Sequence, residues 1–151
     1  MALCWHWSRF EELGIHALYE ALALRQRVFN LEQHCDYVDA DGLDPHAWHL
    51  LGRNDEGKLV AYLRLVDPGY KYDEPSIGRV VTDASARGNG SGRLLMIEGV
   101  AGCDRLWPGL AVRISAQAHL QRYYQAVGFE TVSAEYLEDG IPHVEMLRSA
   151  R

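Results

Sequence analysis

The pattern of apolar and polar positions along the chain changes period several times, and each period predicts an element. Residues 110–115 alternate apolar and polar side chains, with Leu110, Val112 and Ile114 on one face, which predicts a β-strand. Between residues 16 and 33 the apolar positions follow the helical period instead. One face of that predicted helix carries Leu18, Ala21, Leu22, Val28 and Phe29.

The other segments predict strands interleaved with helices. Strands are expected over 2–10, 47–53, 59–67, 76–83, 130–138 and 143–149, and helices over 92–106 and 117–127. Residues 54–57 form the turn of a hairpin, and 35–45 form an acidic loop that ends at Pro45. This order indicates an α/β (α+β) fold with one mixed, mostly antiparallel central sheet and helices on both of its faces.

Length and composition narrow the class of protein. The 151 residues fit one domain, 1–151, and their 48% hydrophobic and 24% charged content is that of a folded protein. A net charge of −6 argues against nucleic-acid binding, since phosphate backbones recruit basic surfaces. The apolar runs fall short of the roughly 20 residues of a membrane helix, and the N-terminus lacks the pattern of a signal peptide. Three cysteines without metal-binding spacing predict reduced thiols, no metal and a cytoplasmic protein.

The run RGNGSG at 87–92 follows a predicted strand and precedes a predicted helix. The first amides of a helix lack internal partners, and glycines let a phosphate approach them closely. Arg87 and Arg93 flank the run and add positive charge. The spacing matches neither a Walker A loop nor a dinucleotide fingerprint. Spacing alone therefore leaves two readings open, a flexible turn and an anion cradle.

A resemblance to a known superfamily bears on that choice. Arg87-x-x-Gly90-x-Gly92 resembles the [R/Q]-x-x-G-x-[G/A] signature of the GCN5-related N-acetyltransferases, and Tyr124 with Gly128-Phe129 resembles their YxxxGF. Stretches over 24–37, 115–129 and 136–143 resemble the ElaA-type branch, so the likeness spans nearly the whole chain. The sequence departs from the pattern mildly, with Asp36 and Ala84 where proline is usual.

The resemblance implies an N-acetyltransferase that uses acetyl-CoA as co-substrate and no metal. It implies that the loop amides and flanking side chains hold the diphosphate, namely Arg87, Gly88, Asn89, Gly90, Ser91, Gly92 and Arg93. It implies that Val80, Val81 and Thr82 offer backbone groups to the pantetheine arm and thioester carbonyl, and that Tyr124 protonates the departing thiolate. From spacing alone, Tyr124 could instead be a core residue on one helix face.

The acceptor is expected to be a primary amine of a small molecule or peptide, and it must lose a proton. Arg25 and Glu32 continue the stripe of Leu18, so they form either a structural ion pair or a polar floor of the acceptor site, with Glu32 as a candidate base. Further candidate bases are His49, His119 and His143, above all His143. A further hypothesis is that the acidic loop attracts a cationic acceptor such as a polyamine or a lysine side chain through Asp36, Asp39, Asp41 and Asp44.

Alternative functions stay open. The chain could be a non-catalytic acyl-CoA-binding or sensing module, or an acyltransferase similar to acyl-homoserine lactone synthases, which the RxxVFxxE pattern at 25–32 resembles. An acetyl-cysteine intermediate on Cys35 or Cys103 is a further alternative, although no neighbouring residue in sequence activates either thiol. A homodimer through an exposed strand edge is also open.

Overall fold

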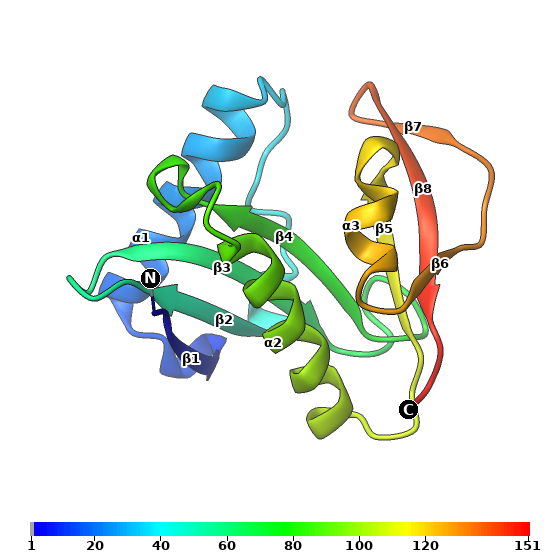
Figure 1. Ribbon diagram of the computed structural model, residues 1–151, viewed down its shortest axis with the longest axis horizontal. Coiled ribbons are helices and arrows are strands. Elements are labelled where there is room, and N and C mark those ends of the chain that lie inside the picture. The colour runs from blue at the N-terminus through cyan, green and yellow to red at the C-terminus, as the bar shows by residue number, and fades with distance from the viewer. Residues whose placement is uncertain (1) are drawn as a thin grey trace.

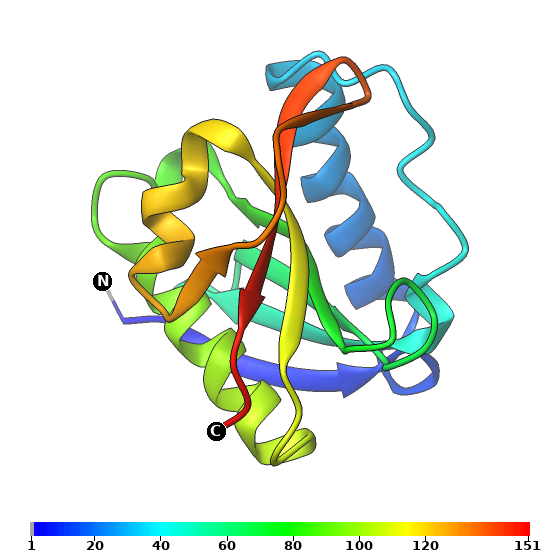
Figure 2. The same ribbon diagram turned by 90° about the vertical axis from the view of Figure 1, so that its right-hand side faces the viewer.

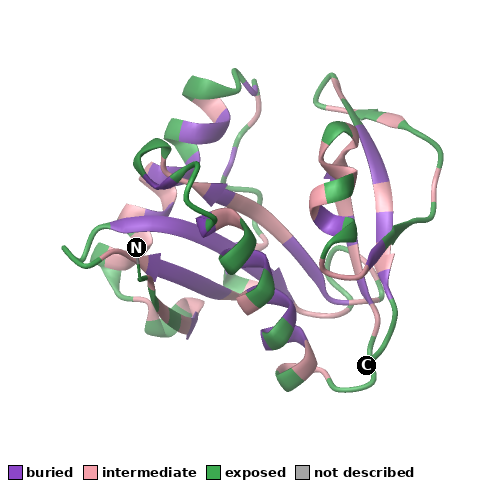
Figure 3. Ribbon diagram, viewed as in Figure 1, coloured by how far each residue is buried: buried purple, intermediate pink, exposed green. Residues whose placement is uncertain are grey.

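The computed structural model describes residues 2–151. Its first sheet is antiparallel and has the order β1 (Cys4–Arg9), β2 (Ala47–Arg53), β3 (Leu59–Val66) and β4 (Ser76–Thr82). The β2–β3 hairpin turns at residues 54–57 as the sequence predicts, and the Asn54 side chain accepts hydrogen bonds from two amides of that turn. All eight residues of β3 are buried, which Figure 3 shows as a continuous purple strand. Burial on both faces explains its unbroken apolar run.

The second sheet is also antiparallel and has the order β5 (Val112–Gln117), β8 (Ile141–Arg148) and β6 (Phe129–Thr131), with β7 (Tyr136–Glu138) paired to β8 as well. The segment predicted as one strand over 130–138 is therefore two short strands. Between them the chain leaves β8. There the Ser133 hydroxyl accepts a hydrogen bond from the Glu145 amide, whereas in a continuous strand a backbone carbonyl would accept it. The predicted single mixed sheet is in fact two antiparallel sheets.

The two sheets meet at the beginning of β4 and β5. The Arg113 amide donates to the carbonyl oxygen of Pro75 at 3.1 Å, and no ladder pairs the rest of these two strands within residues 2–151. From that bond the strands diverge, as Figures 1 and 2 show. The divergence opens a space between the sheets that other elements line.

Helices cover both faces of the first sheet, which confirms the predicted class (Figure 1). The helix α1 (Ile15–Arg25) packs on one face, and α2 (Ser91–Leu106) packs on the other. Alternate residues of β3 divide between these two cores: Ala61, Leu63 and Leu65 belong to the core under α2, and Tyr62 to the core under α1. A short helix, α3 (Gln121–Gln125), follows the 3-10 turn η5 (Ala118–Leu120) beside the second sheet.

The predicted helix over 16–33 changes geometry halfway. After α1 the chain continues as a π-helical segment, η2 (Gln26–Glu32), in which the Gln33 amide donates to the carbonyl of Val28. The remaining short elements are 3-10 turns, namely η1 (Phe10–Glu12), η3 (Asp44–His46) and η4 (Ala84–Ala86). Within residues 2–151, no helix combines the length and apolar character needed to cross a membrane.

Candidate active site

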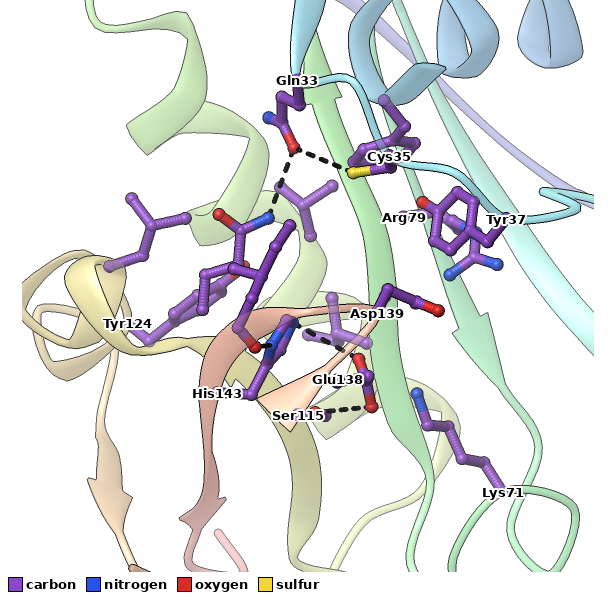
Figure 4. A pocket seen from close by; sticks show the side chains of 17 residues that line it. Gln33, Cys35, Tyr37, Lys71, Arg79, Ser115, Tyr124, Glu138, Asp139 and His143 are labelled. Carbon is purple, nitrogen blue, oxygen red and sulfur yellow. Dashed lines mark hydrogen bonds and ion pairs between the residues drawn. The ribbon is translucent and has the colours of Figure 1, made fainter. Parts of the chain in front are cut away.

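A cavity of about 120 Å³ lies where β4 and β5 diverge. Five parts of the chain line it: the end of η2 with the loop after it, the β3–β4 loop, β4, β5 with α3, and the β7–β8 hairpin. Figure 4 shows how polar side chains from these elements converge on one space. Its labelled lining residues are Gln33, Cys35, Tyr37, Lys71, Arg79, Ser115, Tyr124, Glu138, Asp139 and His143.

Tyr124 of α3 contributes a phenol to the cavity wall. The residue is 8% exposed, and its ring meets those of Tyr123 and Phe129 edge-on, with centroids 5.0 and 6.1 Å away. Burial raises the pKa of Tyr124 to about 12, so the hydroxyl is protonated at neutral pH. Tyr124 thus packs in the core and also borders the cavity, so its position is compatible with both sequence interpretations.

His143 of β8 lines the same cavity, beside the β7–β8 turn, and Figure 4 shows it on the side of Tyr124 and across from Arg79. Its Nδ1 lies 2.7 Å from the carbonyl oxygen of Ile141, and since a carbonyl only accepts, Nδ1 carries a hydrogen. The other nitrogen, Nε2, faces a carboxylate oxygen of Glu138 at 3.3 Å. Glu138 also accepts a hydrogen bond from the Ser115 hydroxyl at 3.1 Å. With the hydrogen on Nδ1, the acceptor nitrogen of the neutral ring is Nε2, which lies beside Glu138.

A β-bulge shapes the wall that β4 provides. Tyr62 pairs with Val81 and Arg64 with Gly78, so Leu63 faces two residues, Arg79 and Val80. Arg79 has a left-handed backbone with φ of 51°. Two other non-glycine residues near the cavity share a positive φ, but His34 follows a helix end and Asp139 begins a Asp-Gly hairpin turn, where this geometry is ordinary. In mid-strand it is a strained conformation of the kind that functional sites retain.

The contacts of the Arg79 side chain hold the bulge in place. Its Nε lies 2.9 Å from Asp39, its Nη2 lies 3.3 Å from Asp41, and its guanidinium lies over the ring of Tyr37 at 5.1 Å. Val80, the next residue, lines the cavity, whereas Val81 points into the core under α1. Of the three residues expected to offer backbone groups, Val80 thus borders the cavity directly.

The glycine run forms the turn between η4 and α2. Gly88 and Gly90 have φ of 82° and 84°, which a side chain would strain, and open space lies where their Cβ atoms would be. Gly90 is the N-cap of α2, and the side-chain oxygen of Asn89 before it accepts from the Ser91 amide at 3.1 Å and from the Ser91 hydroxyl at 2.6 Å. Within residues 2–151 the amides of Gly88, Gly90 and Gly92 have no hydrogen-bond partner. A diphosphate fits this turn, because free amides and a helix N-terminus face open space.

Arg87 and Glu32 meet at the edge of this turn. Arg87 donates to the carbonyl oxygen of Thr82 at 2.9 Å, and its guanidinium lies 2.7 Å from the Glu32 carboxylate. Glu32 is exposed and does not line the cavity, so the structure sets it beside the glycine turn and apart from His143. The wide turn of the π-helical segment moves Glu32 off the stripe that begins at Leu18. Arg93 is exposed on the first turn of α2.

The predicted ion pair of Arg25 with Glu32 is wrong. Arg25 is 1% exposed, and its guanidinium lies 2.7 Å from Asp39 and 2.9 Å from Asp44. It does not line the cavity, so its expected part in binding the acceptor has no geometric support. The partners of Arg25 come from the acidic loop, which sequence spacing could not bring to this helix.

The acidic loop is tied down by arginines. Asp44 also lies 2.9 Å from Arg64, and Asp41 accepts from Arg64 at 2.8 Å. Together with the contacts of Arg25 and Arg79, three arginines neutralise Asp39, Asp41 and Asp44. Of the four acidic residues expected to attract a cation, only Asp36 is exposed without such a partner among residues 2–151.

The other histidines and the thiols stand apart from this chemistry. His49 is buried, with its two nitrogens hydrogen-bonded to the Tyr62 hydroxyl and the Asp44 carbonyl, and His119 is exposed on η5. Burial raises the pKa of the Cys103 thiol to about 12, and that of Cys35 also lies above its ordinary value because of burial. Neither thiol is therefore activated as a nucleophile, although Cys35 borders the cavity. Residues 2–151 present no group of three or more side chains suited to a metal ion.

Sequence reasoning missed several polar residues of the cavity, namely Lys71, Arg79, Ser115, Glu138 and Asp139. Three of them were within reach. Lys71 falls in the loop before β4, and Glu138 and Asp139 fall in the stretch 136–143 that resembles the ElaA-type branch. Ser115 and Arg79 gave no signal, because one is an ordinary polar position of a strand and the other depends on a bulge.

Known proteins resemble this chain over most of its length. A family model described as an acetyltransferase (GNAT) domain matches residues 26–149. The UPF0039 protein sll0451 of Synechocystis is 46% identical over 147 residues, which cover 97% of this chain and 96% of that protein. Protein ElaA of Escherichia coli is 42% identical over 147 residues, covering 95% of each chain.

Solved structures resemble the chain over the same length. The crystal structure of an acyl-CoA N-acyltransferase from Pseudomonas aeruginosa is 45% identical, with a TM-score of 0.92, and the alignment covers 98% of this chain and 100% of that one. The crystal structure of Escherichia coli ElaA superposes with a TM-score of 0.91 over 98% and 100% of the two chains, at 39% identity.

Proposed function

This chain belongs to the GNAT acetyltransferase family, and from that membership and the geometry of the cavity we propose that it transfers the acetyl group of acetyl-CoA to a primary amine of a small molecule or peptide. The family supports acyl-CoA N-acyltransferase activity. The acetyl donor and the amine acceptor are the parts that the proposal adds.

One observation carries the proposal: adjacent residues of α3 serve the two parts of the site. The Tyr123 hydroxyl donates to the carbonyl oxygen of Gly92 at 2.6 Å, so it holds the glycine turn, while Tyr124 lines the cavity. A donor bound by the turn would therefore extend toward a protonated phenol. This is the arrangement that a general acid requires, since it must lie within reach of the atom it protonates.

The donor would be held by the chain as follows. The free amides of Gly88, Gly90 and Gly92 would bind the diphosphate, with Arg93 nearby and with Arg87 released from Glu32 as the phosphates arrive. The bulge at Arg79 and Val80 would direct backbone groups of β4 at the pantetheine arm and the acyl carbonyl. The bound thioester supplies an acetyl group with a good leaving group.

The side chains of the cavity account for the protons. The acceptor amine gives up a proton, which Nε2 of His143 takes, and the amine nitrogen forms the C–N bond to the acetyl carbon. As the C–S bond breaks, Tyr124 gives its proton to the departing sulfur. The acceptor enters as an ammonium ion and loses two protons in all. One of them restores the phenol of Tyr124 and the other leaves to solvent, so the products are an amide, a free thiol and one proton.

The test is Tyr124→Phe, which keeps the ring and removes the hydroxyl. We expect kcat for thiol release, measured with acetyl-CoA and an amine panel, to fall by about 10²- to 10⁴-fold, the usual contribution of acid–base catalysis. The Kd for CoA should stay unchanged. Tyr19→Phe is the matched control, because Tyr19 is 75% exposed and lines no part of the cavity.

Two outcomes would contradict the proposal. Unchanged turnover in Tyr124→Phe would remove the acid role. If the wild-type protein binds CoA tightly but acetylates no amine of the panel, a non-catalytic acyl-CoA sensor becomes the better description.

A further inference from the structure

The charges of the cavity wall divide into a neutralised set and a free set. Arg79 belongs to the neutralised set, because Asp39 and Asp41 hold its guanidinium. Behind the wall, Arg25 and Arg64 pair with the same acidic loop, so three cations face the three anions Asp39, Asp41 and Asp44. Whatever selects an acceptor by charge must therefore come from the remaining ionisable groups.

Lys71 is a cation of the cavity that makes no ion pair within residues 2–151, and its ammonium lies 5.7 Å from the centroid of the Tyr72 ring. It is exposed in the loop before β4, and within residues 2–151 no carboxylate lies within 4.0 Å of its ammonium. Figure 4 shows that the ammonium points toward Glu138 and Asp139 of the hairpin on the other side of the opening. Glu138 is already engaged by His143 and Ser115. The opening thus presents the ammonium of Lys71 across Glu138 from His143, the group that we propose to deprotonate the amine, with the carboxylate of Asp139 nearby.

The position of Lys71 excludes a role toward the diphosphate. The loop of Lys71 precedes β4, and the glycine turn follows it. The seven residues of β4 separate these two ends by about 20 Å, from the rise of a strand. An anion that Lys71 binds must therefore belong to the molecule that enters from the acceptor side.

The free volume limits how large that molecule is. The cavity of about 120 Å³ is well below the 300–1,000 Å³ that enclose a drug-sized ligand. A polyamine would also bring a second ammonium toward Lys71, and like charges repel. A short zwitterion meets both conditions, with its amine toward His143 and its carboxylate toward Lys71.

We propose that the acceptor is a small amine that carries a carboxylate a few bonds from its nitrogen, of the amino-acid type, and that Lys71 selects it. The inference rests on the proposed acetyl transfer. It makes Lys71 a specificity-determining residue that binds the acceptor and takes no part in the transfer of protons.

The experiment compares matched acceptors in the thiol-release assay. Each standard L-amino acid is paired with its own carboxamide, which keeps the amine and removes the negative charge. Rates are expressed per unprotonated amine, because the two members differ in amine pKa. For the best acceptor we expect kcat/KM to favour the acid over the carboxamide by about 10-fold or more, the effect of one hydrogen bond to a charged group.

Substitutions at Lys71 assign that preference. Lys71→Gln should bring the acid and the carboxamide to within about 2-fold of each other by lowering kcat/KM for the acid alone, and Lys71→Arg should retain the preference. Lys58→Gln is the control, since Lys58 pairs with Asp83 outside the cavity, and it should leave the ratio unchanged. Thermal unfolding checks that each variant is folded.

Other results overturn the inference. If carboxamides or simple amines are acetylated as well as the acids, or if Lys71→Gln lowers both members of a pair equally, Lys71 does not select a carboxylate. If acetylation occurs only on lysine side chains of peptides, the acceptor class is wrong while acetyl transfer stands. If no amine of any class is acetylated, the proposed function fails first.

Discussion

Asp44→Asn tests whether the buried ion pairs of the acidic loop stabilise the protein by charge. One oxygen of Asp44 lies 2.9 Å from Arg25 and 2.9 Å from Arg64, and these arginine side chains are 1% and 2% exposed. Asparagine has the same shape and still offers an oxygen to both guanidinium groups. The substitution therefore removes a charge and little else.

The size of the effect follows from the burial of both arginines. Three guanidinium groups would remain against two carboxylates, and one positive charge would be uncompensated in the protein interior. Removing one partner of a buried pair costs about 3–5 kcal/mol, mainly because the other charge stays desolvated. A domain of this size has about 5–15 kcal/mol of stability in total, so the change is a large part of it.

The assay is equilibrium unfolding in urea, followed by tryptophan fluorescence. Urea is preferred because guanidinium chloride would screen the charges under study. Asp36→Asn is the control: Asp36 is exposed, so its free energy of unfolding should change by less than about 0.5 kcal/mol. A loss below about 1 kcal/mol in Asp44→Asn would refute the reasoning, because the charge would then be compensated by solvent or by Asp39 and Asp41.

The pH dependence of stability gives the same test a second readout. Burial alone would raise the pKa of Asp44, but the hydrogen bonds and charges of Arg25 and Arg64 outweigh it and hold the pKa below its ordinary value. A carboxylate with a lowered folded-state pKa contributes stability that is present above the unfolded pKa of about 3.9 and is lost as the pH falls below it. The wild-type protein should lose this contribution below about pH 4, and Asp44→Asn should show a shallower acid limb.

Two further predictions concern the glycine turn. Gly90→Ala should raise the Kd for CoA by about 10-fold, measured by calorimetry, because alanine resists a φ of 84°. Gly57→Ala is the control, because Gly57 has a φ of 81° in the β2–β3 turn. It should lower the free energy of unfolding about as much as Gly90→Ala does and leave the Kd for CoA unchanged. Tyr123→Phe removes the 2.6 Å hydrogen bond to the Gly92 carbonyl, so it should raise KM for acetyl-CoA by about 5-fold with little change in kcat, and an unchanged KM would show that the turn holds its shape without that bond.

The sequence predicted the order and class of the elements because most of them carry a clean period. The hairpin with its turn at 54–57 is one example, and α2 is another, since it was predicted over 92–106 and spans Ser91–Leu106. Two features of the fold were not predicted from the periodicity. The π-helical segment η2 and the break between β6 and β7 preserve a helical or extended pattern locally, and only hydrogen bonds reveal the change of geometry.

The candidate site divides in the same way. Short motifs singled out Tyr124 and the glycine turn as candidates, and His143 follows a turn in the stretch 136–143 that resembles the ElaA-type branch. Arg25 was assigned wrongly, since its partners lie 14 and 19 residues further along the chain. Pairings of this kind depend on how the acidic loop folds back over β3, which no local spacing encodes.

Arg79 connects the stability of this loop to the shape of the cavity. A left-handed arginine in mid-strand costs about 1–3 kcal/mol, and such a residue persists only where its surroundings fix it. Asp39 and Asp41 fix its guanidinium, which in turn supports the ring of Tyr37, and the bulge places Val80 on the neighbouring wall. The acidic residues that looked like an attractant for a cationic acceptor therefore build the wall instead. Arginines neutralise the charges of Asp39, Asp41 and Asp44. Charge can therefore distinguish acceptors only through the ionisable groups at the opening that lack such partners, and Lys71 is the positive one that we propose for this role.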